Sequence, residues 1–309
     1  MLMPIIQANA THTPQVRHLL HTGRHVYGSF GDEDLPALLD KALALLGEAQ
    51  GAPWGFLCIQ VEDRPTTLPA LAPDRAYLRA LALDRGRSPS QDVVALMEVA
   101  MQQLHTYARP VEIIVYGGET WFIKPLLTAG FVMAERVAFF RLALERRATR
   151  TPVWPWAGGL GSHKPPSEVA QLRAMQPSDI ETLAQLDAET FTPLWHFGAK
   201  DLWELLFRAR AQVALLDDQL VGYAAISVTG DEAHLARLAV HPAAQGRGIG
   251  HQLLRDCIAY AQDNHLTAIA LNTQVSNERS QRLYRQLGFR PTGLVLSVLT
   301  KTISPINIT

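Results

Sequence analysis

A glycine-containing turn between a predicted strand and a predicted helix constrains the fold of this chain most strongly. The strand reads HLARLAV (234–240), the turn follows as HPAAQGRGIG (241–250), and apolar residues then recur at helical spacing to residue 261. Glycines let a backbone approach a ligand closely and adopt conformations that other residues avoid. A helix that begins directly after the turn presents N–H groups without intrahelical partners and a partial positive charge. The turn therefore predicts an anion site.

Two common phosphate-binding motifs do not match this turn. A P-loop requires Lys followed by Ser or Thr after its glycines, and neither pair follows here. A dinucleotide-binding turn requires a third glycine where this chain has His251. The spacing is instead Q-x-x-G-x-G, with Gln245, Gly248 and Gly250, and Arg247 adds a positive charge at the rim. A pyrophosphate fits such a turn, and the alternative is a tight turn that binds no ligand.

Patterning along the C-terminal half indicates alternating helices and strands. We expect helices at 178–190, 201–211, 249–261 and from 277 to a closing Gly288, and strands at 212–228 (two strands around a turn at Asp217-Asp218), 232–240, 267–273 and 293–303. The N-terminal half repeats two landmarks. Leu81 matches Leu238 at an offset of 157 residues, and Gly130 matches its counterpart Gly288 at 158. A tandem duplication explains the shared offset, and chance similarity between short strings is the alternative.

Composition bounds the number of domains. The chain has 309 residues, of which 48% are hydrophobic, and this length favours about two domains. Residues 147–168 are rich in Pro, Gly, Ser and Thr, which resist regular ladders or cost entropy to order. They predict a linker between one domain at 1–146 and another at 169–309.

Charge, cysteines and hydropathy argue against several partners. The formal net charge of −1 gives no electrostatic case for binding nucleic acid or an anionic membrane. Cys58 and Cys257 lie far apart in apolar contexts, which is typical of buried thiols in a reducing compartment and indicates no metal site. No segment has eighteen uninterrupted apolar residues, and the N-terminus lacks a signal-peptide pattern. We therefore expect a cytoplasmic protein that needs no metal.

The glycine turn and a second motif together resemble the GNAT superfamily of acyl-CoA-dependent N-acyltransferases. After LAV and Q-x-x-G-x-G the chain carries N-x-x-S-x-x-L-Y-x-x-L-G-F, formed by Asn277, Ser280, Leu283, Tyr284, Leu287, Gly288 and Phe289. The resemblance covers roughly residues 170–302, with both motifs in the family's order and spacing. It implies an α/β (α+β) fold of two GNAT-like domains, each with a mixed, mostly antiparallel central sheet flanked by helices.

The resemblance implies direct transfer of an acetyl group from acetyl-CoA to a primary amine of a small molecule. Backbone N–H groups of residues 245–250 would cradle the pyrophosphate, and a splay between the strands at 232–240 and 267–273 would admit the acyl group. The implied cofactor-binding residues are Leu238, Ala239, Val240, Gln245, Gly246, Arg247, Gly248, Ile249, Gly250, Asn277, Ser280 and Tyr284. Asn277 caps its helix, binds the cofactor, or does both.

The resemblance also assigns an acid to the reaction. Tyr284 matches the family tyrosine that protonates the leaving thiolate, and packing of its ring in the core is the alternative. Ribosomal-protein alanine acetyltransferases carry a glutamate where this chain has Asn272. An amide cannot take up a proton at neutral pH, so this departure weakens the case for a protein N-terminus as the acceptor.

His234 is the candidate base. It stands five residues before Ala239, where histone acetyltransferases carry a glutamate and arylalkylamine acetyltransferases a histidine. Alternation along the strand would place His234 on the same side as Leu238 and Val240. Its ordinary pKa near 6.5 suits proton uptake at neutral pH. The alternative is a surface histidine, with a carboxylate at 231–232 acting through water.

An aromatic segment, ETFTPLWHFGAKDLW, lies where the family places the acceptor-binding connection between its first two helices. Its candidate pocket residues are Phe191, Trp195, His196 and Phe197. Such a patch encloses an apolar or aromatic amine, or it packs in the core, and the sequence leaves both open.

The N-terminal half lacks the residues that the resemblance assigns to the cofactor. At the 157 offset Ser88 replaces the glutamine of the turn, and its three glycines become Pro89, Gln91 and Val93. At the 158 offset Leu126 replaces the tyrosine. We expect a degenerate GNAT-like domain that packs against the catalytic half or closes its acceptor cleft. Alternatives are a non-catalytic acyl-CoA-binding or regulatory protein, and an acetyltransferase for a protein or, as in mycothiol synthases of similar architecture, a thiol precursor.

Overall fold

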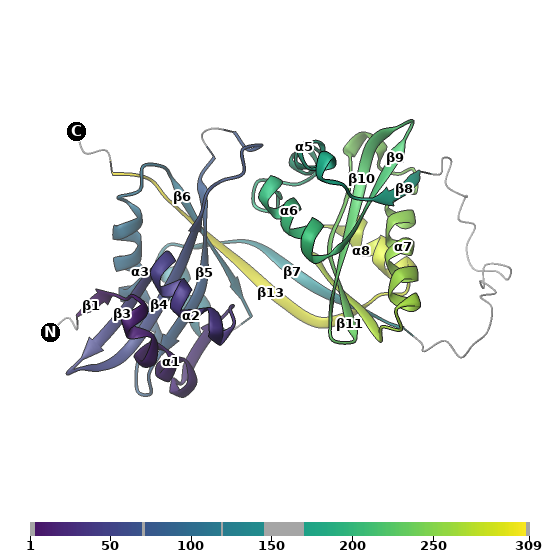
Figure 1. The fold of residues 1–309 in the computed structure, drawn as a ribbon. Helices are drawn as coiled ribbons and strands as arrows, with labels where there is room; N and C mark the ends of the chain where they lie inside the picture. Colours follow the sequence, from purple (N-terminus) through teal and green to yellow (C-terminus); the bar gives the residue numbers. More distant parts are fainter. Residues whose placement is uncertain (1–3, 70–71, 119, 145–169, 307–309) are drawn as a thin grey trace. The chain divides into compact units, whose positions relative to one another are not determined.

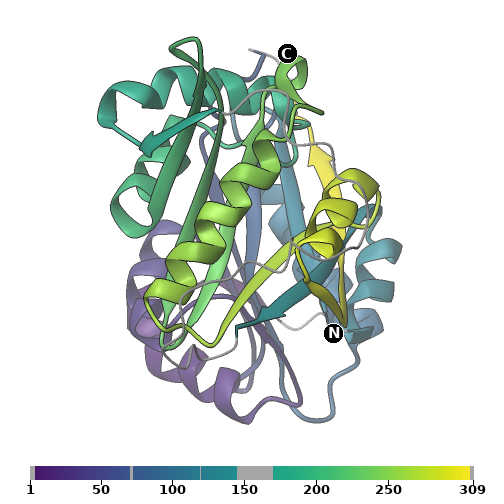
Figure 2. The same ribbon diagram turned by 90° about the vertical axis from the view of Figure 1, so that its right-hand side faces the viewer.

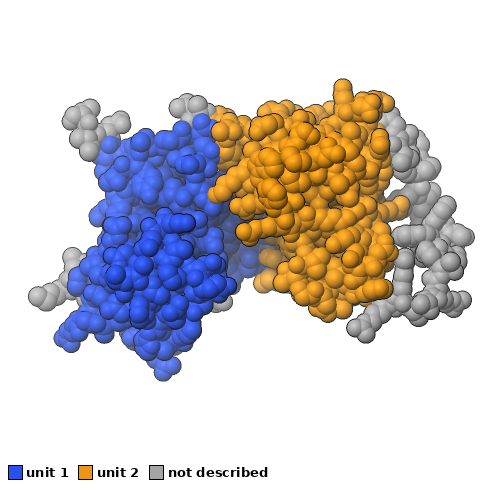
Figure 3. All heavy atoms as spheres, in the orientation of Figure 1, with its two compact units in different colours: residues 1–64, 71–137, 295–309 blue, residues 65–70, 138–294 orange. Residues whose placement is uncertain are grey.

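The computed structural model of the chain describes residues 4–69, 72–118, 120–144 and 170–306, so the predicted linker at 147–168 lies outside the described residues. The chain forms two compact units, coloured blue and orange in Figure 3. Unit 1 contains Met1–Arg64, Leu71–Val137 and Val295–Thr309, and unit 2 contains Pro65–Ala70 and Ala138–Leu294.

Unit 1 is built on the antiparallel strands β3, β4 and β5, with β6 parallel to β5 (Figure 1). Its elements are β1 (Ile5–Gln7), α1 (Thr13–Thr22), β2 (His25–Gly28), α2 (Leu35–Lys41), β3 (Leu43–Ala49), β4 (Ala52–Glu62), β5 (Asp74–Leu83), α3 (Pro89–Leu104), β6 (Val111–Gly117), α4 (Thr120–Thr128) and the first part of β7 (Val132–Ala143). Side chains alternate between two cores. Leu45 and Leu57 pack with α3 and α4, whereas Ala44 and Phe56 pack with α1 and α2.

Unit 2 repeats this arrangement. Strands β8 to β11 are antiparallel and β12 is parallel to β11. Its elements are β8 (Gln171–Ala174), α5 (Ile180–Thr190), α6 (Ala199–Arg208), β9 (Arg210–Leu216), β10 (Gln219–Thr229), β11 (Glu232–Val240), α7 (Ile249–Asp263), β12 (Ala268–Gln274), α8 (Glu278–Gln286) and the first part of β13 (Arg290–Ile303). Helices α5 and α6 cover one face of these strands and α7 and α8 the other (Figure 1). Figure 2 views unit 2 from the face of the strands that α7 and α8 cover, and it shows α7 lying along the strands.

The helices and strands predicted for the C-terminal half are confirmed, and so is the mixed, mostly antiparallel fold. Asp217 and Asp218 both have positive φ, 49° and 62°, as the predicted turn between β9 and β10 requires. Gly288, with φ of 93°, follows the end of α8. Its N–H donates to the carbonyl of Arg285 at 3.1 Å, and the N–H of Phe289 donates to that of Tyr284 at 3.0 Å. This Schellman motif fixes the last turn of the helix that carries Tyr284.

The last strand of each half of the sequence, β7 or β13, pairs with strands from the other half. β13 leaves unit 2 at Leu294 and pairs antiparallel with β6 over Ser297–Ile303. β7 leaves unit 1 at Val137 and lies between β13 and β12 in the strand order. The compact units therefore differ from the predicted domains 1–146 and 169–309 at these strands, because hydrogen bonding to a distant strand leaves no mark in the local sequence pattern. No helix among the described residues is long and apolar enough to span a bilayer.

Candidate active site

The predicted anion site forms a turn at the N-terminus of α7. Gly246 and Gly248 have φ of 84° and 91°, a backbone conformation that residues with a side chain rarely adopt. Gly248 is the N-cap of α7, and the first intrahelical bond runs from the N–H of Gln252 to its carbonyl at 3.1 Å. The N–H groups of the first helical turn therefore have no acceptor within the helix, which is the arrangement that binds anions.

Two side chains tie this turn to neighbouring elements. Nε2 of Gln245 donates to the carbonyl of Val240 at the end of β11, at 2.8 Å. Nη1 of Arg279 in α8 donates to Oε1 of Gln245. A Cβ atom on Gly246 would lie 3.7 Å from Nη2 of Arg279, so this guanidinium lies beside the glycine turn. Sequence reasoning missed Arg279, because its position within the second motif is a variable one.

Strands β11 and β12 are paired over a short stretch only. Their parallel register joins Glu232–His234 to Ala268–Ala270, whereas β11 continues to Val240 and β12 to Gln274. β11 remains paired with β10 along its other edge as far as Val240. The two strands therefore diverge after His234, as the predicted splay requires.

A β-bulge in β11 changes the face on which His234 lies. Ile226 pairs with Leu235 and the preceding Ala225 with Arg237, so Ala236 is an extra residue. An extra residue reverses the alternation of side chains along a strand. His234 consequently lies on the same face of β11 as Arg237 and Ala239. The prediction that it lies on the same side as residues 238 and 240 is wrong.

His234 occupies the point where the two strands begin to diverge. Its side chain is half-buried, and burial lowers its pKa below the ordinary value. The imidazole is therefore neutral at neutral pH and has a nitrogen lone pair that can accept a proton. Its cross-strand neighbour is Ser227 of β10.

Tyr284 is buried in the core of unit 2. Its ring centroid lies 6.2 Å from that of Phe140 and 6.0 Å from that of Phe289. Burial raises its pKa to about 12, although a hydrogen bond with Ser280 and the charge of Arg237 act in the opposite direction. The phenol therefore carries its proton throughout the physiological range and can act as a donor.

Asn277 has the helix-capping role that the sequence allowed. Its Oδ1 accepts from the N–H of Ser280 at 3.1 Å, so it caps α8. The part of Asn277 in binding a cofactor stays a prediction. Asn272, where the alanine acetyltransferases carry glutamate, is exposed on β12.

Three of the four predicted acceptor residues contact one arginine, Arg237, whose side chain is 10% exposed. We call residues 191–198 the acceptor segment. The guanidinium carbon of Arg237 lies 3.6 Å from the ring centroid of Phe191 and 4.0 Å from that of Phe197. Its Nη2 donates to the carbonyl of Trp195 at 2.8 Å. The rings of Phe191 and Phe197 therefore stack on a cation.

Asp187 of α5 balances this charge. It is fully buried and accepts from Nε of Arg237 at 2.9 Å, from Oη of Tyr223 at 2.5 Å and from the N–H of Phe197 at 2.7 Å. Burial opposes ionisation of Asp187, but the neighbouring imidazole of His196 and the guanidinium of Arg237 outweigh it and hold its pKa below the usual range. No sequence pattern marks this pair, because Asp187 and Arg237 stand fifty residues apart and each has apolar neighbours in the chain.

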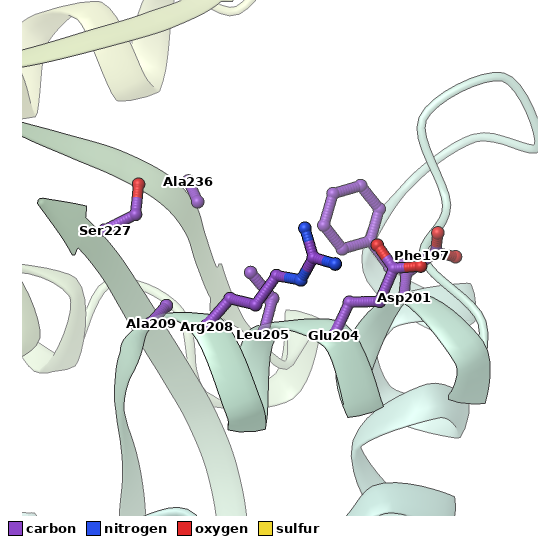
Figure 4. Close-up of a pocket in the computed structure, with 8 residues that line it drawn as sticks. All are labelled: Phe197, Asp201, Glu204, Leu205, Arg208, Ala209, Ser227 and Ala236. Atoms are coloured by element: carbon purple, nitrogen blue, oxygen red, sulfur yellow. The ribbon is translucent and has the colours of Figure 1, made fainter. Parts of the chain in front are cut away.

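A hollow lies between α6 and strands β10 and β11 (Figure 4). We call it the α6 hollow; it is lined by Phe197, Asp201, Glu204, Leu205, Arg208, Ala209, Ser227 and Ala236. One of the four predicted pocket residues, Phe197, is among them. The hollow ends at Ser227, the cross-strand neighbour of His234, so the candidate base adjoins the candidate acceptor site.

In unit 1, other parts of the chain lie at the positions that correspond to the glycine turn and to the end of β11. The buried carboxylate of Asp92 accepts from the N–H of Ser88 at 2.8 Å at the N-terminus of α3 and forms an ion pair with Arg87. β2 pairs with Ala80–Leu83 of β5, the residues that correspond at the 157 offset to Arg237–Val240 of β11. A carboxylate therefore lies at the N-terminus of α3, and a strand pairs with the part of β5 that corresponds to the end of β11.

Comparison with known proteins identifies the family. The model of the acetyltransferase (GNAT) family matches residues 180–289. A Bacillus subtilis protein, provisionally named as a ribosomal protein bS18-alanine N-acetyltransferase, is 30% identical over 129 residues, which are 40% of this chain and 83% of that protein. The N-alpha-acetyltransferase RimI of Mycobacterium tuberculosis is 31% identical over 140 residues, 41% of this chain and 83% of that protein. The chain belongs to the GNAT family and is an N-acetyltransferase, as its motifs predicted.

A solved structure has a similar fold over the length of this chain. The tandem GNAT protein from the clavulanic acid biosynthesis pathway covers 99% of this chain and 100% of its own, with a TM-score of 0.62 and 16% sequence identity. At this identity the likeness concerns the fold, and it confirms the prediction of two GNAT-like halves.

Proposed function

We propose that unit 2 binds one acetyl-CoA and transfers its acetyl group to a primary amine of a small molecule. The observation that carries the proposal is that one unit holds three features: the Gln245–Gly250 turn, the divergence of β11 from β12, and the buried Tyr284. Unit 1 keeps the fold, but Asp92 and β2 fill the corresponding places.

The residues present fit acetyl-CoA, the co-substrate of the family. The first-turn N–H groups of α7 and the guanidinium of Arg279 would hold the pyrophosphate. The edge of β11 over residues 238–240 would pair with the pantetheine amides, since β12 has diverged there. When bound, acetyl-CoA supplies an acetyl group activated as a thioester.

Tyr284 and His234 divide the proton transfers. Tyr284 keeps its proton because its pKa is about 12, and it would donate that proton at Oη to the leaving sulfur. His234 would accept a proton from the amine, since its lowered pKa keeps the ring neutral. The carboxylates that offered another route are engaged elsewhere. Asp231 accepts from the hydroxyl of Thr267 at 3.2 Å, and Glu232 forms an ion pair with Arg141 at 2.6 Å.

An N-terminal alanine of a protein is the second candidate acceptor. It is favoured by the similarity to proteins named as bS18-alanine and N-alpha-acetyltransferases. That similarity covers about two fifths of this chain, and Asn272 replaces the glutamate of that subgroup. The α6 hollow is lined by the carboxylates of Asp201 and Glu204, the guanidinium of Arg208 and the ring of Phe197 (Figure 4), and this mixed polar lining is compatible with a small polar amine.

A screen of acceptors tests the proposal. Release of free thiol from acetyl-CoA would be followed with 2-phenylethylamine, spermidine, glucosamine and a hexapeptide that begins with alanine. Faster release with a small amine supports the proposal, and release with the peptide alone would favour the second candidate. No amine-dependent release across a broad panel, together with acetyl-CoA binding, would instead indicate an acyl-CoA-binding protein.

A further inference from the structure

A short segment from the N-terminal half of the sequence belongs to unit 2. Residues 65–69 lie within the connection between β4 and β5, two strands of unit 1, yet they cluster with unit 2. A turn forms within the segment, where the N–H of Leu68 donates to the carbonyl of Pro65 at 3.0 Å. Leu68 is buried. We call residues 65–69 the bracing loop.

The bracing loop contacts the acceptor segment directly. Oγ1 of Thr67 lies 2.6 Å from Nε2 of His196, which is fully buried. Two residues further along, a Cβ atom on Gly198 would lie 2.6 Å from Cβ of Pro65, so only a glycine permits this approach. The loop thus holds the end of the acceptor segment that leads into α6.

His196 extends this contact to the buried ion pair. Its Nδ1 lies 3.6 Å from Oδ1 of Asp187, which is within ion-pair range and longer than a hydrogen bond of good geometry. The carboxylate favours a proton on Nδ1, which leaves Nε2 to accept from the Thr67 hydroxyl. Asp187 in turn holds the N–H of Phe197, whose side chain lines the α6 hollow. A continuous series of contacts therefore runs from Thr67 to the wall of the hollow.

We infer that Thr67 and His196 are positioning residues for the acceptor. They hold the acceptor segment so that Phe197 keeps its place in the wall of the α6 hollow, at the end opposite Ser227 (Figure 4). The inference rests on the proposed function, and it gives the N-terminal half a part in acceptor binding although that half's own cofactor site is filled. Neither residue touches the glycine turn, so acetyl-CoA binding should not depend on them.

Three variants test this inference. Thr67→Val removes the hydroxyl and keeps the shape, Thr67→Ser keeps the hydroxyl, and Thr66→Val is a matched control at the exposed neighbouring position. Amide hydrogen exchange of residues 187–198 would be measured by mass spectrometry. KM would be measured for acetyl-CoA and for whichever of 2-phenylethylamine and the alanine-initiated hexapeptide the wild type acetylates faster.

The expected pattern separates positioning from general damage. Thr67→Val leaves a buried imidazole nitrogen unsatisfied, so acceptor KM should rise about tenfold and exchange at 187–198 should accelerate. KM for acetyl-CoA should stay within about twofold, and Thr67→Ser and Thr66→Val should behave like wild type. Unchanged acceptor KM and exchange in Thr67→Val, or an equal rise in both KM values, would overturn the inference. If the wild type acetylates neither probe, the proposed function fails with these acceptors, and the exchange measurement alone decides whether Thr67 braces the segment.

Discussion

Replacing Tyr284 with Phe separates proton donation from packing. The ring would keep its contacts with Phe140 and Phe289, and only the hydroxyl and its hydrogen bond with Ser280 would be lost. Loss of one hydrogen bond lowers the free energy of unfolding by about 1 kcal/mol. Loss of a positioned acid lowers turnover by roughly 10² to 10⁴, which raises the activation free energy by about 3 to 5 kcal/mol. Activity should therefore fall far more than stability.

Thiol release at saturating acetyl-CoA measures turnover, calorimetry measures cofactor affinity, and thermal unfolding measures stability. Tyr260→Phe is the matched control, because it removes a half-buried phenol of α7 that lies against Arg210 and outside the site. Because the folded pKa of Tyr284 is about 12, this group should cause no loss of wild-type turnover up to about pH 10. Full activity in Tyr284→Phe would mean that water protonates the thiolate and that the tyrosine only packs.

Three further substitutions probe the site. Gly248→Val should abolish acetyl-CoA binding in calorimetry while the circular dichroism spectrum stays native. The control, Gly51→Val, changes another glycine with positive φ (79°) that lies in unit 1, and it should bind acetyl-CoA normally. Tight binding by Gly248→Val would show that the turn does not hold the pyrophosphate. His234→Ala should slow acetylation most near neutral pH and less at alkaline pH, where the amine loses its proton unaided, and a wild-type pH–rate profile would exclude it as the base. Asp187→Asn leaves the buried guanidinium of Arg237 without its counter-charge and should destabilise the fold by about 3 to 5 kcal/mol in urea unfolding. The pKa of Asp187 in the folded protein lies below its unfolded value near 3.9. The loss of unfolding free energy in Asp187→Asn should therefore be complete above about pH 5 and shrink as the pH falls through the folded pKa. A loss that does not change with pH would contradict this reasoning.

Local features of the site could be predicted because their causes are local. The glycine turn shows in the sequence as Q-x-x-G-x-G, since positive φ at Gly246 and Gly248 calls for glycine. The same holds for the paired aspartates of the β9–β10 turn and for Gly288 after α8. Each of these residues is dictated by backbone geometry within a few positions of itself.

Long-range features could not be predicted. Nothing in HLARLAV marks Ala236 as a bulge, yet this one residue reverses the side of the strand on which His234 lies. Asp187 and Arg237 meet only when α5 packs against β11. The sequence leaves the aromatic segment open as a pocket or as core packing, and nothing in it indicates the cation on which the rings stack. The sequence shows that the N-terminal half lacks the glycines. It does not show that the Asp92 carboxylate bonds the N–H of Ser88 at the N-terminus of α3, because this contact depends on side-chain geometry.

Calorimetric titration of acetyl-CoA into the full chain counts the cofactor sites and locates them in one unit or in both. Unit 2 has the glycine turn and the free edge of β11, whereas in unit 1 Asp92 and β2 take the corresponding places. We expect one site per chain, and we expect Gly248→Val to eliminate this site. Two sites of similar affinity, or one site that survives Gly248→Val in a folded protein, would contradict it.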